Sequence, residues 1–151
     1  MPSIRELIKD YLVKAKLMQL ATSTDGQPWV CSVWFASDDD LNIYWLSSLT
    51  RRHSYEVSTN NKVAAAIALP QTPKDSPIGL QLQGVAELLT DEAEVEKAIS
   101  VYADRIFTRE QIDAFMKSEV RPHRFYRIRP TQFVLFDTVN FPDNSRQEYV
   151  P

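Results

Sequence analysis

The sequence contains little glycine, cysteine or histidine, and each shortage excludes a class of site. Only three of the 151 residues are glycine, whereas the phosphate-binding loops of dinucleotide folds and nucleoside triphosphatases need several glycines close together. The single cysteine, Cys31, rules out an internal disulfide and a multi-cysteine metal centre. Two histidines, His53 and His123, are too few for a multi-histidine metal centre, although one could serve as an axial ligand. A phosphate-bearing ligand would therefore have to be held by side chains and one helix end.

The sequence also lacks a strong net charge and long apolar runs. The formal net charge is −3, so no overall field would attract the chain to nucleic acid or to an anionic membrane surface. No run approaches the length of a membrane span, and the N-terminus has no signal-peptide pattern. Together with the lone cysteine, this predicts a reducing, cytoplasmic location. Hydrophobic residues make up 44% and charged residues 25%, which is typical of a globular domain, and we expect one domain over residues 1–151.

Apolar residues at helical spacing, each set preceded by a capping residue, predict four helices. The predicted starts are Ser3 (with Glu6 completing a capping box), Thr50, Asp91 (with Glu94) and Thr108 (with Gln111). The first helix should end near Lys16 and the second around residues 60–61. The third carries an apolar stripe that we interpret as core packing, formed by Val95, Ala98, Ile99, Tyr102 and Ile106.

Runs with β-strand alternation, separated by turn residues, predict six or more strands. Their ranges are 17–23, 29–37, 41–47, 62–70, 78–90, 123–129 and 132–138. The sequences Asp25-Gly26-Gln27-Pro28 and Asp38-Asp39-Asp40 have the composition of tight turns, so the first three strands should form an antiparallel meander. Pro130-Thr131 should separate the last two strands. The fold class expected is a β-rich α+β domain, an antiparallel barrel with flanking helices, because closure removes exposed strand edges.

Polar and cationic side chains are concentrated where the strand 41–47 gives way to the second helix. This part of the chain contains Ser47, Ser48, Thr50, Arg51, Arg52 and His53. A helix N-terminus already carries partial positive charge, so two arginines there are unfavourable unless an anion is bound. Free amides, hydroxyls and guanidinium groups would then converge on one phosphate. We interpret residues 47–53, called the 47–53 segment below, as a phosphate site. The alternative is that both arginines simply point into solvent.

A helix, a hairpin around DGQP, a strand ending YWLSS, a helix opening TRRH and the strand NNKVAAAI follow one another in this chain. This order resembles the FMN-binding split barrels related to pyridoxamine 5′-phosphate oxidase, and is most similar to a small branch whose phosphate segment reads Thr-Arg-His. The resemblance covers roughly residues 4–138 and is strongest over 17–69. It implies a split β-barrel that forms a homodimer, with FMN bound in clefts between the subunits.

The resemblance also implies which residues bind the cofactor. The segment whose backbone lies against the flavin ring falls on Val30, Cys31, Ser32 and Val33, and the polar strand end beside the cofactor falls on Leu46 and Ser47. The phosphate pair falls on Arg52 and His53, next to Thr50 and Arg51; histidine here replaces lysine, which would make phosphate affinity depend on pH. The family's flavin-contacting glutamine matches Gly79, so Gln81 or Gln83 on the same strand would have to substitute.

The function implied is that of an FMN-dependent oxidoreductase, which passes electrons between a reduced donor, such as a nicotinamide, and an unknown small substrate. The oxidase's substrate-binding arginine motif is not recognisable near the C-terminus, and no catalytic acid or base stands out. Two alternatives stay open. One is a non-catalytic module that stores or senses flavin or haem, and the other is a split-barrel dimer that has lost its ligand.

Overall fold

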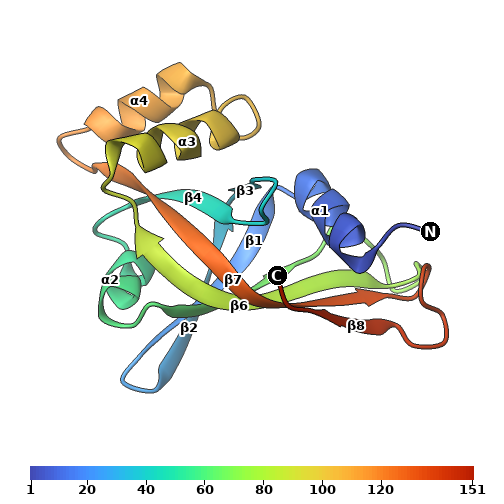
Figure 1. The fold of residues 1–151 in the computed structure, drawn as a ribbon. Coiled ribbons are helices and arrows are strands. Elements are labelled where there is room, and N and C mark those ends of the chain that lie inside the picture. The colour runs from blue at the N-terminus through green and yellow to red at the C-terminus, as the bar shows by residue number, and fades with distance from the viewer.

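Eight antiparallel strands form one curled sheet in the computed structural model, which describes residues 1–151 (Figure 1). The strand order is β2-β1-β5-β6-β7-β4-β3, and β8 pairs with β7. The strands are β1 (Leu17–Thr24), β2 (Gln27–Trp34), β3 (Ala36–Ser37), β4 (Ile43–Ser48), β5 (Lys62–Ile67), β6 (Ile78–Leu88), β7 (His123–Asp137) and β8 (Arg146–Tyr149). The predicted β-rich, six-or-more-stranded split barrel with flanking helices is confirmed.

Four helices flank the sheet: α1 (Ile4–Lys14), α2 (Arg52–Thr59), α3 (Glu92–Tyr102) and α4 (Arg109–Lys117). The capping boxes predicted at Ser3 and Thr108 are both present, with side-chain and backbone bonds in each direction. The carboxylate of Asp91 accepts a hydrogen bond from the backbone N–H of Glu94 and caps α3. No helix has the length and apolar character needed to cross a membrane.

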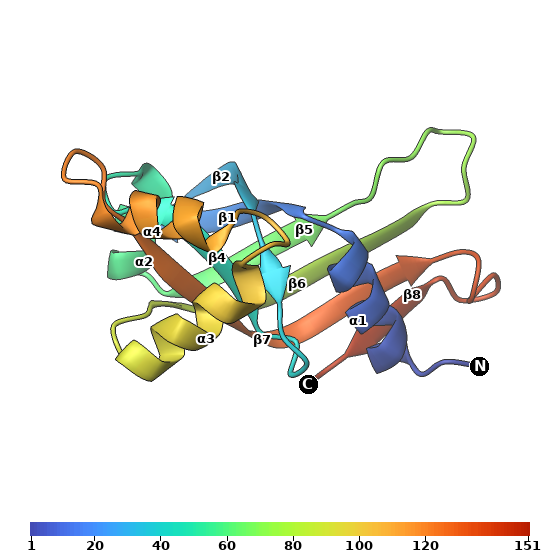
Figure 2. The ribbon, with the colours of Figure 1, turned by 90° about the horizontal axis from the view of Figure 1, so that it is seen from above.

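Apolar side chains pack on both faces of β4 and β7. The inner face of the curled sheet holds the main core, which includes Trp45, Tyr126 and Phe133 together with the apolar side of α1. On the other face, α3 and α4 cover a second core around Tyr44 and Phe125 (Figure 2). The apolar stripe predicted for the third helix contributes to this second core, as expected.

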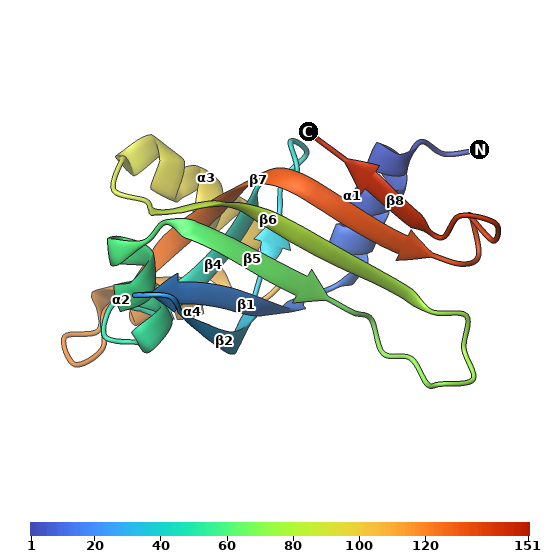
Figure 3. The same ribbon diagram turned by 90° about the horizontal axis from the view of Figure 1, so that it is seen from below.

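The outer face of β1, β5 and β6 is not covered in the same way. In the view from below, no helix crosses the middle of these three strands (Figure 3). The burial of β5 alternates strictly, with Val63, Ala65 and Ile67 buried and the alanines between them exposed. Such alternation is typical of a sheet with one packed face and one open face.

The first hairpin is tighter than the four-residue turn predicted. Asp25 and Gly26 both have positive φ, 53° and 76°, and they alone connect β1 to β2. Positive φ at both central residues is the requirement of a two-residue type I′ turn. Gln27 and Pro28 belong to β2, where proline is tolerated because β2 lies at the end of the sheet.

Two predicted strand arrangements differ from the structure. Both antiparallel pairings of the predicted meander are present, but the predicted strand 29–37 is divided into β2, which pairs with β1, and β3, which pairs with β4 at the opposite end of the sheet. The other neighbour of β4 is β7, with Ile43 opposite Ile128. The ranges 123–129 and 132–138 form one strand, β7, rather than two. Its register against β6 shifts next to Gly84, which faces Pro130, so Thr131 is an extra residue in a bulge. A Cβ atom on Gly84 would lie 2.4 Å from the carbonyl oxygen of Arg129, so glycine permits the close approach.

Several elements are shorter than predicted, and one more is present. Helix α1 ends at Lys14 rather than near Lys16, and β5 ends at Ile67, where the proline-containing loop 68–77 begins. The polar C-terminal tail contains β8, which pairs with β7 and continues the sheet.

Candidate functional site

Helix α2 begins without a side-chain cap. The predicted N-cap, Thr50, is wrong: the N-cap is Arg51, whose side chain makes no capping bond. The turn after β4 brings the Thr50 hydroxyl to 2.9 Å from that of Ser48, so it cannot reach the helix. The first-turn amides of α2 therefore have no side-chain acceptor, and an anion placed there would provide one.

His53 lies just inside the start of α2 and is only 8% exposed. Its Nε2 lies 2.7 Å from the hydroxyl of Ser47, the penultimate residue of β4. Burial, followed by the charge of Arg51, lowers the pKa of His53 from its ordinary value, while Glu56 opposes the shift. The imidazole is therefore mainly neutral near pH 7.

Arg52 is held by two contacts that the sequence interpretation did not include. Its guanidinium lies 3.8 Å from the ring centroid of Trp29, in cation–π geometry. Its Nε donates a hydrogen bond to Oε2 of Glu56 at 2.7 Å. The other carboxylate oxygen of Glu56 accepts a hydrogen bond from the hydroxyl of Thr22 at 2.9 Å. Neither Nη nitrogen of Arg52 makes a hydrogen bond within the protein, so both are available to a ligand.

Arg51 makes neither of the contacts that hold Arg52. Its side chain is exposed and makes no hydrogen bond or ion pair. The alternative that the arginines point into solvent therefore describes Arg51, whereas Arg52 is held against the protein surface by Trp29 and Glu56.

Strand β2, the predicted ring-binding segment, is the free edge at one end of the sheet and pairs only with β1. An edge strand presents main-chain N–H and C=O groups that no neighbouring strand uses. Along β2 the side chains of Cys31 and Val33 turn toward the core, whereas Val30 and Ser32 turn outward. Burial raises the pKa of the Cys31 thiol, with a smaller contribution from Glu56.

Two adjoining hollows lie on the open outer face of the sheet. The larger, of about 570 Å³, is lined by residues that include Ala66, Phe136 and Arg146. The smaller, of about 400 Å³, brings together Val30, Gln81 and Gln83, three of the predicted cofactor-binding residues. The hollows are open above β5 because the outward-facing side chains of this strand are alanines, which are short.

The predicted site residues thus fall into two groups. Ser47, Thr50, Arg51, Arg52 and His53 gather at the start of α2, while Val30, Ser32, Gln81 and Gln83 face outward from the sheet. Strands β1 and β5 separate β2 from β6, which corresponds to about 14 Å across the sheet. Three predicted site residues belong to neither group: Leu46 packs against the second core beneath α3 and α4, and the side chains of Cys31 and Val33 turn toward the main core.

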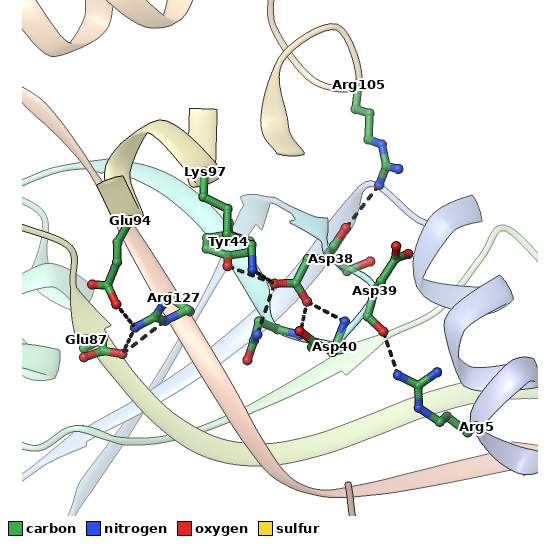
Figure 4. Close-up of polar contacts among 12 residues, drawn as sticks. Arg5, Asp38, Asp39, Asp40, Tyr44, Glu87, Glu94, Lys97, Arg105 and Arg127 are labelled. Atoms are coloured by element: carbon green, nitrogen blue, oxygen red, sulfur yellow. Dashed lines mark hydrogen bonds and ion pairs between the residues drawn. The ribbon is translucent and has the colours of Figure 1, made fainter. Parts of the chain in front are cut away.

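A second polar network joins α3 to the sheet and has a structural role (Figure 4). Arg127, only 7% exposed, pairs with Glu87 and Glu94; burial opposes its charge, but these carboxylates raise the pKa of Arg127. Asp38 accepts hydrogen bonds from Tyr44 and Asn42. Burial and then Asp38 raise the pKa of Tyr44 to about 12.

The family model for pyridoxamine 5′-phosphate oxidase matches residues 4–136, most of the chain. The chain belongs to the pyridoxamine 5′-phosphate oxidase family. No curated protein matches the sequence. The family assignment agrees with the resemblance found from the order of elements, from the first helix through the TRRH segment.

Solved structures with the same fold include haem-binding, haem-storage and FAD-binding proteins. A haem-binding protein from Mycobacterium smegmatis is 17% identical with a TM-score of 0.81; the match covers 99% of this chain and 59% of that one. The haem storage protein HutZ from Vibrio cholerae is 22% identical, with a TM-score of 0.70 and coverage of 85% and 91%. An FAD-binding protein from Mesorhizobium loti is 24% identical, with a TM-score of 0.64 and coverage of 87% and 90%. At these identities the likeness establishes the fold.

Three residues that the sequence interpretation did not include contribute to the site: Thr22, Trp29 and Glu56. For Glu56 a signal was available, because it lies four residues after Arg52, a spacing at which side chains of opposite charge meet on a helix. Thr22 and Trp29 reach the site only through the pairing of β1 with β2, which places them opposite each other.

Proposed function

We propose that this protein binds FMN and uses it as an oxidoreductase. The observation that carries the proposal is the start of α2, where an uncapped helix N-terminus meets an arginine whose two Nη nitrogens are free. Both features suit a phosphate monoester, since the amides and the guanidinium supply hydrogen-bond donors and positive potential. The buried hydroxyl of Ser47 and the imidazole of His53 adjoin this point.

Each part of the proposed site has a separate task. Arg52, the α2 amides and the exposed Arg51 hold the phosphate, with Thr50 and His53 beside them. The main chain of Val30, Cys31, Ser32 and Val33 on the edge strand β2 orients the ring, and the β4 end at Leu46 and Ser47 lies beside it. Bound flavin supplies the redox chemistry, taking electrons from a nicotinamide donor and passing them to a small substrate. The protein positions the ring and limits access of water to it.

The proposal includes a homodimer with ligand clefts between the subunits. The outer face of the sheet exposes Ala64, Ala66 and Phe136 beside the two hollows. An apolar, open sheet face of this kind is typical of an association site. Gln81 and Gln83 lie on this face, so in the dimer they would approach a cleft completed by the second copy.

A second candidate is non-catalytic binding of haem or flavin. Haem-binding and haem-storage proteins are among the similar structures. An axial ligand would have to come from His53 or His123. Nδ1 of His123 lies 2.8 Å from the carbonyl oxygen of Arg121, and its Nε2 makes no bond within the protein. His123 is therefore the imidazole that this candidate requires.

The visible absorbance spectrum of freshly purified protein, repeated after addition of FMN and then of a nicotinamide donor without oxygen, tests the proposal. We expect the two-banded spectrum of oxidised flavin, which bleaches when the donor is added. Flavin bands that persist after the donor is added would favour a non-catalytic flavin module. A Soret band would favour the haem candidate, and a protein that stays colourless at saturating FMN would contradict flavin binding.

A further inference from the structure

Arg52 occupies an unfavourable helix position, and Glu56 and Trp29 compensate for it. The first turn of a helix carries partial positive charge, and an Arg-to-Glu pair in this order is the weaker of the two i,i+4 orientations. Yet the Arg52–Glu56 bond is short, at 2.7 Å, and it is made to a carboxylate in a residue that is 3% exposed. A buried carboxylate is unfavourable without partners, so this arrangement needs both Arg52 and Thr22.

The geometry divides the guanidinium of Arg52 into a used part and a free part. Nε donates to Glu56, while the plane of the group lies over Trp29. The two Nη nitrogens remain, and these are the donors that bind phosphate in bidentate arginine contacts. Glu56 therefore fixes the orientation of the donors that Arg52 presents to a ligand.

The charges around the 47–53 segment largely cancel. The carboxylate of Glu56 offsets the guanidinium of Arg52 at a distance of 2.7 Å, and the buried imidazole of His53 is neutral. Arg51 is left as the uncompensated cation. A phosphate dianion bound to the Nη atoms of Arg52 would have the guanidinium between itself and Glu56. At that separation the carboxylate of Glu56 would still repel the phosphate.

We propose that Glu56 is a positioning residue that directs Arg52 toward the ligand phosphate and, through its own charge, weakens phosphate binding. The inference rests on the proposed function for the identity of the ligand. The effect of the Glu56 charge does not depend on the ligand being FMN, because the same charges act on any phosphate bound at the 47–53 segment. Glu56 is part of the site even though it does not touch the ligand.

Glu56→Gln separates the charge of Glu56 from its position. The glutamine amide oxygen can accept the bond from Arg52, and its NH₂ can donate to the hydroxyl of Thr22, so both contacts survive. Removing the negative charge should lower the FMN dissociation constant about tenfold. This is a modest change for the loss of repulsion between the carboxylate of Glu56 and the phosphate of FMN on either side of one guanidinium group. Riboflavin, which lacks the phosphate, should bind as it does to the wild type. Flavin fluorescence measures both affinities.

Three further variants control the comparison. Glu110→Gln removes a charge from an exposed position on α4 and should change neither affinity. Thr22→Val breaks the second contact of Glu56 but keeps the charge, so it should not tighten FMN binding. Glu56→Met removes the charge together with the hydrogen bond that orients Arg52. It should therefore tighten FMN binding less than Glu56→Gln does, and equal tightening would show that Glu56 does not position Arg52.

Inorganic phosphate distinguishes failure of this inference from failure of flavin binding. Its binding is followed by tryptophan fluorescence, with Trp29→Phe to identify the reporting ring. If neither protein binds flavin but Glu56→Gln binds phosphate more tightly than the wild type, flavin binding is wrong and the role of Glu56 stands. The inference is overturned if Glu56→Gln binds FMN, or phosphate in the absence of flavin binding, no more tightly than the wild type. It is also overturned if riboflavin binding tightens equally.

Discussion

The hydroxyl of Ser47 and Nε2 of His53 lie 2.7 Å apart, so a buried hydrogen bond joins the end of β4 to the start of α2. A second is donated by the hydroxyl of Ser54 to the carbonyl oxygen of Ser48 at 2.8 Å. The two bonds span a turn in which Leu49, Thr50 and Arg51 are exposed, and the first holds the imidazole beside the uncapped helix end. A protonated imidazole in this place would lie near Arg51 in a buried environment. The arrangement around the hydrogen bond to Ser47 therefore favours the neutral form of the His53 imidazole.

This arrangement predicts a loss of stability in acid. Burial and Arg51 lower the folded-state pKa of His53 below its ordinary value of 6.5. Between these two values the unfolded chain binds more protons, so stability is fully present above about pH 6.5 and falls as the pH drops toward the folded-state pKa. His53→Gln cannot be protonated and can still bond to Ser47. Urea unfolding at a series of pH values should show a decline below pH 6.5 in the wild type that the variant lacks, and parallel curves would contradict the assignment.

Gly84 should be required by the bulge in β7. Its missing side chain allows the backbone of Arg129 and Pro130 to approach, and an added Cβ would lie 2.4 Å and 2.9 Å from atoms of these residues. Gly84→Ala should lower the free energy of unfolding by about 1–3 kcal/mol, as overpacking does in other cores. Gly79, in the same strand, has no atom within 4 Å of an added Cβ, so Gly79→Ala is the matched control. Equal stability of the two variants, measured by urea unfolding, would disprove the close contact.

The open outer face should be the dimer interface. We expect the wild type to sediment as a dimer at micromolar concentration. Ala66 lies between the two hollows and is exposed, so Ala66→Glu should place a charge in the interface and yield a folded monomer. Ala93→Glu, at an exposed position on α3, should leave the dimer intact. A wild-type monomer would contradict the dimer and its shared clefts. A dimer that tolerates Ala66→Glu would show that the interface lies on another face.

Local signals in the sequence predicted the elements well. The capping boxes at Ser3 and Thr108 act within four residues, and the Asp25-Gly26 turn depends only on backbone preferences at two positions. The alternation of β6, with Leu80 and Leu82 inside, follows directly from strand geometry. Such features do not depend on the rest of the fold.

Features set by distant parts of the chain could not be predicted in the same way. The pairing of β4 with β7 joins residues that are 75 to 85 positions apart, and no local pattern encodes it. Pro130 looks like the end of a strand, but Gly84 on the neighbouring strand allows the strand to continue. Thr50 has the chemistry of an N-cap, yet the turn after β4 directs its hydroxyl to Ser48. The contact between Trp29 and Arg52 likewise exists only because β2 and α2 meet in space.

The central claim is that the 47–53 segment binds the phosphate of FMN, and Arg52→Ala tests it most directly. Titrations of FMN and of riboflavin, followed by flavin fluorescence, are compared for the wild type, Arg52→Ala and Arg51→Ala. A charged hydrogen bond contributes roughly 1.5–3 kcal/mol, so FMN should bind Arg52→Ala about ten- to a hundredfold more weakly than the wild type. Arg51→Ala should lose less, because its side chain is not held in place, and riboflavin should bind all three proteins equally. If Arg52→Ala binds FMN as tightly as the wild type does, the phosphate lies elsewhere and this account of the site is wrong.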